Sequence, residues 1–147
     1  VLNPAPATTE LDLDYACRCD FFMPNETELE ILTGMPVQSL DEIEAAASQL
    51  LDHGLKHLVV TLGKRGALHM HGKQRTHLSA PSVSAVDTTG AGDAFVGCFA
   101  STYIASGDID ASIQRAVRYA SHSVTSRGTQ TSYATRAEFD SWLKNAT

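Results

Sequence analysis

The stretch DTTGAGDAFVG, residues 87–97, combines turn-forming residues, an acid and the start of an apolar segment. Its pattern predicts a helix that begins near Gly90 and runs to Ser106. The first N–H groups of a helix have no internal partner and carry partial positive charge. Gly90 and Gly92, with the small Ala91 between them, let an anion approach this backbone closely. The stretch therefore predicts an anion-binding turn.

Asp93 follows directly, in the first turn of the same expected helix. A carboxylate there could accept a proton from an attacking hydroxyl, as phosphoryl transfer to an alcohol requires. The alternative is a plain glycine turn with an aspartate that only helps the helix to begin. The stretch lacks the lysine of a Walker A loop and the spacing of GxGxxG. Taken alone, it leaves both interpretations open.

Two other segments carry residues suited to a nucleotide. In NETE, residues 25–28, Asn25 and Glu28 lie one helical turn apart, so an amide and a carboxylate can face phosphates and hydrated Mg²⁺ together. The alternative is an N-cap asparagine followed by acids that the helix dipole favours. TLGKRG, residues 61–66, leaves the end of a buried strand, where α/β sheets bind ligands. Its two basic residues could meet phosphate, or they are solvated charges in a turn.

The histidines and cysteines give weaker indications. His69 and His71 are two apart in an expected strand and share a face, as metal ligands do. No third ligand is evident, so we interpret this face as a solvated one. The cysteines, Cys17, Cys19 and Cys98, are an odd number and predict no disulfide framework. A reducing, intracellular location follows as the expectation.

The elements that must position these residues alternate along the chain. Apolar periodicity and capping residues predict helices over residues 11–18, 26–32, 39–53, 90–106, 109–125 and 135–143. Strands are expected over residues 20–23 and 57–62, and a β-hairpin over 67–71 and 74–78. The strand HLVVTL is apolar almost throughout, as in a parallel sheet covered on both faces. We therefore expect an α/β layered fold with a mostly parallel sheet plus a β-hairpin.

The composition bounds the function. With 147 residues, 43% of them hydrophobic and 19% charged, the chain fits one soluble globular domain. The net charge of −6, with acids and bases interspersed, argues against a nucleic-acid-binding face. No apolar run approaches the roughly 18–20 residues of a membrane helix. The chain opens VLNPAPA without a Met, so we expect a piece of a longer protein.

In this order, the segments resemble the ribokinase-like (PfkB) carbohydrate kinases. DTTGAGDAFVGCFA matches the family's C-terminal signature, and VLNPAPA, PNETELEILTG, TLGKRG and SRGTQTS match its ribokinase branch. Independent motifs in the right order outweigh the purely structural interpretation of each one. The resemblance implies the family's layered α/β/α fold. By this resemblance, residues 1–147 are the C-terminal nucleotide-binding and catalytic portion of the family's domain, and the N-terminal substrate and lid portion is absent.

The resemblance also implies a reaction and its residues. ATP would transfer its γ-phosphate to the 5-hydroxyl of D-ribose, giving D-ribose 5-phosphate. Asp93 would contact the substrate and deprotonate that hydroxyl, and the amides of Gly90, Ala91 and Gly92 would form the anion hole. Asn25 would contact the nucleotide phosphates, and Glu28 would order Mg²⁺ through water. The remaining nucleotide contacts would come from Thr61, Leu62, Gly63, Lys64, Arg65, Gly66 and Gly92.

The family's activating monovalent cation, typically K⁺, implies a further set of oxygen ligands. They would fall on Asp87, Thr89, Ser123, Ser126, Gly128 and Ser132. A loop rich in carbonyl oxygens with one carboxylate is suited to such a hard cation. Bound there, the cation would help to hold the anion-hole loop in shape.

Two alternatives to this hypothesis stay open. The chain could come from another sugar or nucleoside kinase of the family, because the sugar-binding residues lie in the missing half. It could also be a non-catalytic fragment that only binds nucleotide or a partner. We expect no nucleic-acid or membrane partner, a homodimer for the full-length protein, a location in the cytoplasm or also the nucleus, and no activity from this fragment alone.

Overall fold

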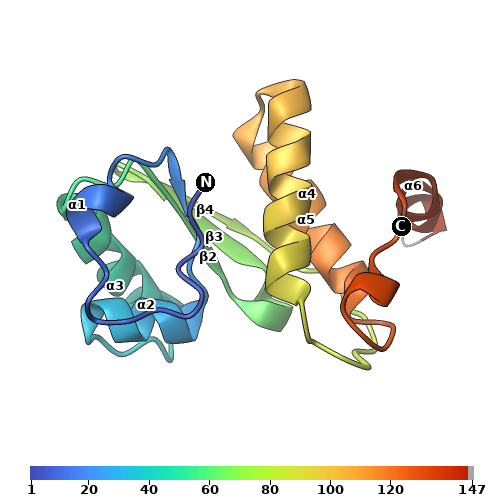
Figure 1. Ribbon diagram of the computed structural model, residues 1–147, viewed down its shortest axis with the longest axis horizontal. Helices are drawn as coiled ribbons and strands as arrows, with labels where there is room; N and C mark the ends of the chain where they lie inside the picture. Colours follow the sequence, from blue (N-terminus) through green and yellow to red (C-terminus); the bar gives the residue numbers. More distant parts are fainter. Residues whose placement is uncertain (146–147) are drawn as a thin grey trace. The chain divides into compact units, whose positions relative to one another are not determined.

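The computed structural model describes residues 1–145, and the chain divides into two compact units (Figure 1). The sheet unit comprises residues 1–63 and 67–77, and the helix unit comprises residues 64–66 and those from 78 onward. Among the helices described, none is both long enough and apolar enough to cross a membrane.

The sheet unit holds a four-stranded sheet in the order β1-β2-β3-β4. Its strands are β1 (Phe21–Phe22), β2 (His57–Thr61), β3 (Ala67–His71) and β4 (Gln74–Leu78), and its helices are α1 (Leu13–Ala16), α2 (Glu26–Thr33) and α3 (Leu40–Asp52). Strands β1 and β2 are parallel, whereas β2 and β3 are antiparallel, so the sheet is mixed. The α/β class expected from the sequence is confirmed.

The core of the sheet unit lies between one face of the sheet and helices α2 and α3. Alternate residues of a strand point to opposite faces, and Leu58 and Val60 of β2 are fully buried on the helix-covered face. They join Leu29 of α2 with Ile43 and Leu50 of α3 in one apolar cluster. Burial of each such side chain contributes about 1.5–3 kcal/mol. This core sets where the ends of β1 and β2, which carry the segments expected to bind nucleotide, are placed.

The histidines occupy the other face of the sheet, and the expectation of a solvated face is wrong for His69. Only 8% of His69 is exposed, and its Nε2 lies 3.1 Å from Nδ1 of His57. The ring of His57 stacks on His71 and on Phe21, with centroids 4.2 and 4.9 Å apart. Because β2 and β3 are antiparallel neighbours, the register places these rings side by side. The spacing within β3 indicates only that His69 and His71 share a face. It does not show that His57, on the neighbouring strand β2, lies beside them.

The helix unit consists of α4 (Ala91–Ser106), α5 (Ile109–Ser123), the 3₁₀ turn η2 (Gln130–Ser132) and α6 (Arg136–Asn145). Gly107, with a φ of +70°, ends α4, and the carboxylate of Asp108 then caps α5 by accepting from the Ala111 amide. The two-residue turn sends α5 back along α4 (Figure 1). On α6, Phe139 is buried with its ring edge-on to Tyr119, 4.9 Å between centroids.

Several expected elements are shorter in the structure, among them the strand expected over residues 20–23, which is reduced to Phe21–Phe22. For two of the helices, side chains or loops compete for the backbone. The helix expected over residues 11–18 begins later because the Asp12 carboxylate accepts from the amides of Asp14 and Tyr15. The helix expected to reach residue 125 ends at Ser123. There the Val124 carbonyl accepts from the amides that open the glycine-rich loop, those of residues 86 and 87. The end of α5 is thus tied to the loop that leads into α4.

Candidate functional site

The N-terminus of α4 is built on glycine and has no side-chain cap. Gly90 is the N-cap residue, in a left-handed conformation with a φ of +78°, and no side chain makes a capping hydrogen bond. A Cβ at Gly90 would lie 2.6 Å from the Tyr133 hydroxyl and 3.0 Å from the Thr129 side chain, so only glycine fits. At Gly92 a Cβ would meet nothing within 4 Å. The amides at the start of the helix therefore lack a side-chain cap, and their role as an anion hole stays a prediction.

The Gly90–Ala91 peptide is held within the protein at both of its polar ends. Its N–H donates to the carbonyl of Thr88 at 3.2 Å, a long and therefore weak bond. Its carbonyl accepts from the Ala94 amide at 2.9 Å and from the hydroxyl of Tyr133 at 2.8 Å. Of the three amides expected in the anion hole, that of Ala91 consequently has an internal partner, and only a weak one.

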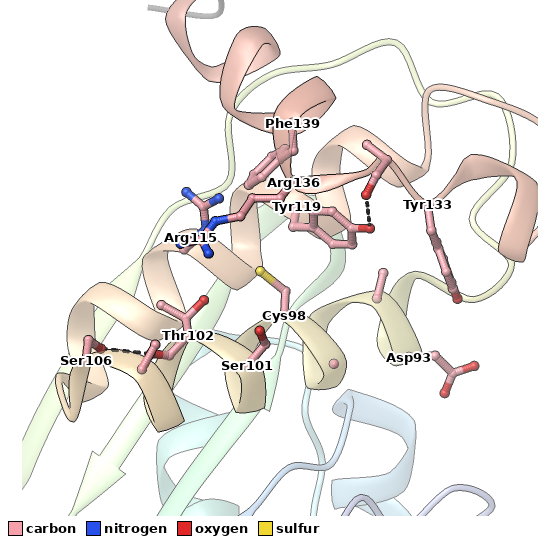
Figure 2. A pocket seen from close by; sticks show the side chains of 14 residues that line it. Asp93, Cys98, Ser101, Thr102, Ser106, Arg115, Tyr119, Tyr133, Arg136 and Phe139 are labelled. Atoms are coloured by element: carbon pink, nitrogen blue, oxygen red, sulfur yellow. Dashed lines mark hydrogen bonds between the residues drawn. The ribbon is translucent and has the colours of Figure 1, made fainter.

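Asp93 lies in the first turn of α4 and is exposed. Together with Tyr133 it lies at one end of a pocket of about 560 Å³ in the helix unit, and Arg115 lies at the other end (Figure 2). Burial and the negative charge of Asp93 raise the pKa of the Tyr133 phenol. Asp93 is thus accessible to a substrate hydroxyl, beside bare helix amides, which is the arrangement that general-base phosphoryl transfer needs.

Asp87 ties the glycine-rich loop to the loop that follows α5. One oxygen of its carboxylate accepts from the Thr89 amide at 3.0 Å, and the other accepts from the Gly128 amide at 2.9 Å. These bonds to Gly128 and Thr89 stabilise the charged form and lower the pKa of Asp87 to about 2. The carboxylate therefore stays ionised and holds two segments together that lie 41 residues apart.

The residues expected to bind a monovalent cation lie in the helix unit, around the same tie. Thr89 and Gly128 each donate their N–H to a different oxygen of the Asp87 carboxylate. The hydroxyls of Ser123 and Ser132 donate to the carbonyls of Ala120 and Thr129, and both serines are buried. Oxygen donors of this kind fit a hard cation. Among residues 1–145, no three His, Cys, Asp or Glu side chains converge to hold a metal ion.

In the sheet unit, the two segments expected to bind nucleotide begin side by side. Asn25 forms a parallel bridge with Thr61, and the Thr61 amide donates to the carbonyl of Pro24 at 3.0 Å. The motifs are far apart in sequence but both leave the carboxyl ends of neighbouring parallel strands, β1 and β2. This is the edge at which open α/β sheets bind ligands. The structure thus brings Asn25 and Thr61 together.

Asn25 and Glu28 form a complete capping box on α2. The Asn25 side chain accepts from the Glu28 amide at 2.8 Å, and the Glu28 carboxylate accepts from the Asn25 amide at 2.7 Å. Glu28 is 8% exposed. The structural interpretation that the sequence left open is therefore confirmed, and one carboxylate oxygen of Glu28 is already used. Their roles toward phosphate and Mg²⁺ stay predictions.

The TLGKRG segment turns sharply after β2. Gly63, Lys64 and Arg65 form the 3₁₀ turn η1 (Gly63–Arg65), and Gly66 follows with a φ of +98°. A Cβ on Gly66 would lie 1.9 Å from the carbonyl oxygen of Leu78, so the backbones approach too closely for any other residue. The glycine there is required by packing, whatever the segment binds. The expected turn at residues 63–66 is confirmed.

Sequence reasoning missed Tyr133, which directly follows the SRGTQTS motif. Its hydroxyl reaches the carbonyl of Gly90, 43 residues away along the chain. The only signal in the sequence is an aromatic residue in an otherwise polar loop, which does not reveal a partner. The contact follows from the fold, because the helix pair α4–α5 returns the chain to the start of α4.

Comparison with known proteins identifies the family. The model of the pfkB family of carbohydrate kinases matches residues 1–136. A deoxyribokinase of Salmonella typhi is 57% identical over 143 residues, which cover 97% of this chain and 47% of that protein. The chain thus spans about half the length of this curated relative.

Solved structures agree in fold. A ribokinase of Thermotoga maritima superposes with a TM-score of 0.87 at 34% identity, over 97% of this chain and 48% of that one. A ribokinase of Arabidopsis thaliana, solved with ribose and ATP, gives a TM-score of 0.84 at 32% identity, over 90% of this chain and 43% of that one. From its residues and its fold alike, the chain belongs to the pfkB family of carbohydrate kinases.

Proposed function

We propose that this chain is the nucleotide-binding and catalytic portion of an ATP-dependent kinase that phosphorylates the primary 5-hydroxyl of a pentose. One observation carries the proposal: the exposed carboxylate of Asp93 stands in the first turn of α4, whose N-terminus is glycine without a side-chain cap. A base beside uncapped helix amides suits a reaction in which a hydroxyl attacks a phosphoryl group.

Asp93 acts as the general base of this reaction. It takes the proton of the 5-hydroxyl while that oxygen forms a bond to the γ-phosphorus of ATP. The bond between this phosphorus and the β,γ-bridging oxygen breaks, and ADP leaves. The amides of Gly90, Ala91 and Gly92 stabilise the charge on the transferring phosphoryl oxygens.

The nucleotide is held by the motifs at the ends of β1 and β2. Asn25 contacts the phosphates, and Thr61, Leu62, Gly63, Lys64, Arg65 and Gly66 line the site. Glu28 would order Mg²⁺ through water with the carboxylate oxygen that does not take part in the capping box. Mg²⁺ neutralises charge on the phosphate oxygens when it is bound. The Arabidopsis ribokinase solved with ATP supports ATP as the donor.

A monovalent cation, K⁺, fits the oxygens around the Asp87 tie. The carbonyls of Thr89, Ser126 and Gly128, with Ser123 and Ser132, offer ligands beside a carboxylate that stays charged. We propose that K⁺ binds there and fixes the loop that enters α4. The test is the rate of the complete enzyme in K⁺ against Na⁺ at equal ionic strength, with faster turnover expected in K⁺.

The acceptor is D-ribose or 2-deoxy-D-ribose. The sequence motifs favour D-ribose, whereas 57% identity to a deoxyribokinase, against 34% to the Thermotoga ribokinase, favours 2-deoxy-D-ribose. Both sugars offer a primary hydroxyl to Asp93. We therefore rank 2-deoxy-D-ribose first and D-ribose second. The residues that distinguish a 2-hydroxyl are proposed to lie in an N-terminal substrate portion of similar length, which also supplies the homodimer contact.

The deciding experiment measures ADP release by the complete protein with 2-deoxy-D-ribose, D-ribose, other sugars and nucleosides. Asp93→Asn should lower kcat by about 10²- to 10⁴-fold, because the general base is lost. Asp110→Asn is the matched control, since Asp110 is an exposed aspartate in the first turn of α5. Turnover in Asp93→Asn as fast as in Asp110→Asn would overturn the role of Asp93.

The 147 residues by themselves are expected to form no pentose phosphate. Half of the relative's length lies outside the chain, and the sugar site is proposed to lie there. Sugar phosphate made by this chain alone would contradict that division. A complete protein that binds ATP but phosphorylates nothing in the panel would instead support the non-catalytic alternative.

A further inference from the structure

The hydroxyl of Tyr133 makes a contact that the proposed chemistry does not yet use. It donates to the carbonyl of Gly90 at 2.8 Å, across 43 residues of sequence. Tyr133 directly follows η2, and its ring lies beside Asp93 at the same end of the pocket (Figure 2). The tyrosine therefore reaches the one peptide group that connects the glycine-rich loop to α4.

Holding the Gly90 carbonyl also orients the Ala91 amide. A peptide group is planar and trans, so the direction of its C=O determines the direction of its N–H. Glycine populates positive and negative φ with similar ease, and Gly90 has a φ of +78°. A peptide next to such a residue rotates readily unless something outside the loop holds it. The Tyr133 hydroxyl supplies that hold at the carbonyl end.

The Asp87 carboxylate holds a different part of this loop. The Asp87 carboxylate binds the amides of Thr89 and Gly128, and so fixes the loop upstream of Gly90. The Ala94 amide also binds the Gly90 carbonyl, but this is the first bond of α4 itself and moves with the helix. Tyr133 is the partner that connects this peptide to the loop after α5.

The tyrosine remains a hydrogen-bond donor under working conditions. Burial and the charge of Asp93 both raise the pKa of the Tyr133 phenol above its ordinary value near 10. The phenol is consequently protonated over the neutral range. It is also the oxygen nearest to a Cβ at Gly90, at 2.6 Å, so it restricts residue 90 to glycine as well as orienting it.

We propose that Tyr133 is a positioning residue of the phosphoryl-transfer site, whose hydroxyl holds the Gly90–Ala91 peptide so that the amides at the start of α4 face the transferring phosphoryl group. The inference rests on the proposed kinase function. It assigns a role to a residue outside the loop motif, and it acts through the backbone rather than through contact with the substrate.

The test compares Tyr133→Phe with Tyr119→Phe in the complete enzyme. Tyr119 is the matched control because its hydroxyl also donates to a backbone carbonyl at 2.8 Å, that of Ala134, which follows Tyr133 in the chain but is not part of the glycine-rich loop. Both variants keep the ring and lose one hydrogen bond of the same kind. Tyr133→Phe should lower kcat by about threefold to tenfold, the equivalent of one ordinary hydrogen bond. The KM values for ATP and sugar should stay within about twofold, since ground-state contacts are unchanged.

A second measurement separates positioning from a general loss of stability. ADP with fluoroaluminate imitates the transferring phosphoryl group, so its affinity in the presence of sugar should fall in Tyr133→Phe by the same factor as kcat. The affinity for ADP alone should not change. Tyr119→Phe should match the wild type in both affinities, and the two variants should melt at similar temperatures. The pH profile of kcat/KM should be unshifted in Tyr133→Phe, because the phenol exchanges no proton.

The outcomes distinguish a failure of the positioning role from a failure of the proposed function. If the wild-type enzyme is active and Tyr133→Phe matches Tyr119→Phe in kcat and in fluoroaluminate affinity, the positioning role is overturned while the kinase function stands. If Tyr133→Phe loses ADP affinity and fluoroaluminate affinity equally, Tyr133 only supports the fold, and the inference is again overturned. If the wild type phosphorylates no sugar or nucleoside, the proposed function fails, and this inference fails with it.

Discussion

The helices α2 and α4 both begin at a motif of the proposed site, yet their N-termini are built in opposite ways. At α2, Asn25 and Glu28 satisfy each other's backbone amides in a capping box. At α4, Gly90 stands at the cap and no side chain covers the amides. A capped terminus is stable by its own local sequence, whereas an uncapped one keeps its donors available to a ligand.

The open terminus of α4 needs support from elsewhere. Asp87 and Tyr133 provide it, each with a bond that spans more than 40 residues and joins the loop before α4 to the loop after α5. The capping box of α2 spans three residues. A helix end can thus be held in place while its amides stay available, provided that the supporting groups bind the loop and not the helix amides.

The largest effect that tests this comparison is expected for Gly90→Ala. The left-handed φ costs about 1–2 kcal/mol for alanine, and the contact of a Cβ with Tyr133 at 2.6 Å adds about 1–3 kcal/mol of overpacking. Gly107→Ala is the matched control, because Gly107 has a φ of +70° but open space around a Cβ. Thermal unfolding of the complete protein should show Gly90→Ala to be the less stable of the two variants. Equal melting temperatures would mean that the loop is not clamped at Gly90.

A smaller effect distinguishes the two roles of Asn25. Asn25→Ala and Ser39→Ala each remove the N-cap of a capping box, so each should cost about 1 kcal/mol of stability. If Asn25 also contacts phosphate, only Asn25→Ala should raise the KM for ATP, by about fivefold or more for one charge-assisted hydrogen bond. Steady-state kinetics with varied ATP measures this. An equal KM for ATP in the two variants would show that Asn25 acts only as a helix cap and does not contact phosphate.

The smallest effect is expected for the pH dependence of the Asp87 tie. The pKa of Asp87 in the folded protein is about 2, below its ordinary value near 3.9. As the pH is lowered, the unfolded chain therefore takes up a proton at Asp87 at a higher pH than the folded protein does. The stabilisation is complete above about pH 4 and is lost as the pH falls through about 2. Urea unfolding should therefore show a difference between wild type and Asp87→Asn that is constant from pH 7 to 5 and shrinks between pH 4 and 2. A difference that persists undiminished at pH 2 would contradict the assigned bonds.

Local signals in the sequence predicted most of the elements and their motifs. The hairpin strands over residues 67–71 and 74–78 and the capping box of Ser39 agree with the structure because hairpin turns and caps are encoded within a few residues. The grouping of the histidines was not predictable in the same way. His57 meets His69 and His71 only because β2 and β3 pair in one particular register.

The kind of chemistry can be inferred from the sequence alone, from glycines and an acid at a helix start and from the motifs that place the chain among the carbohydrate kinases. These are local patterns, and each helix cap or turn forms from residues within three or four positions of one another. Only the tertiary structure decided that Asp87 binds the Gly128 amide and that Tyr133 holds Gly90. These partners meet because α5 folds back along α4, and a contact over 40 residues depends on that packing rather than on any local propensity.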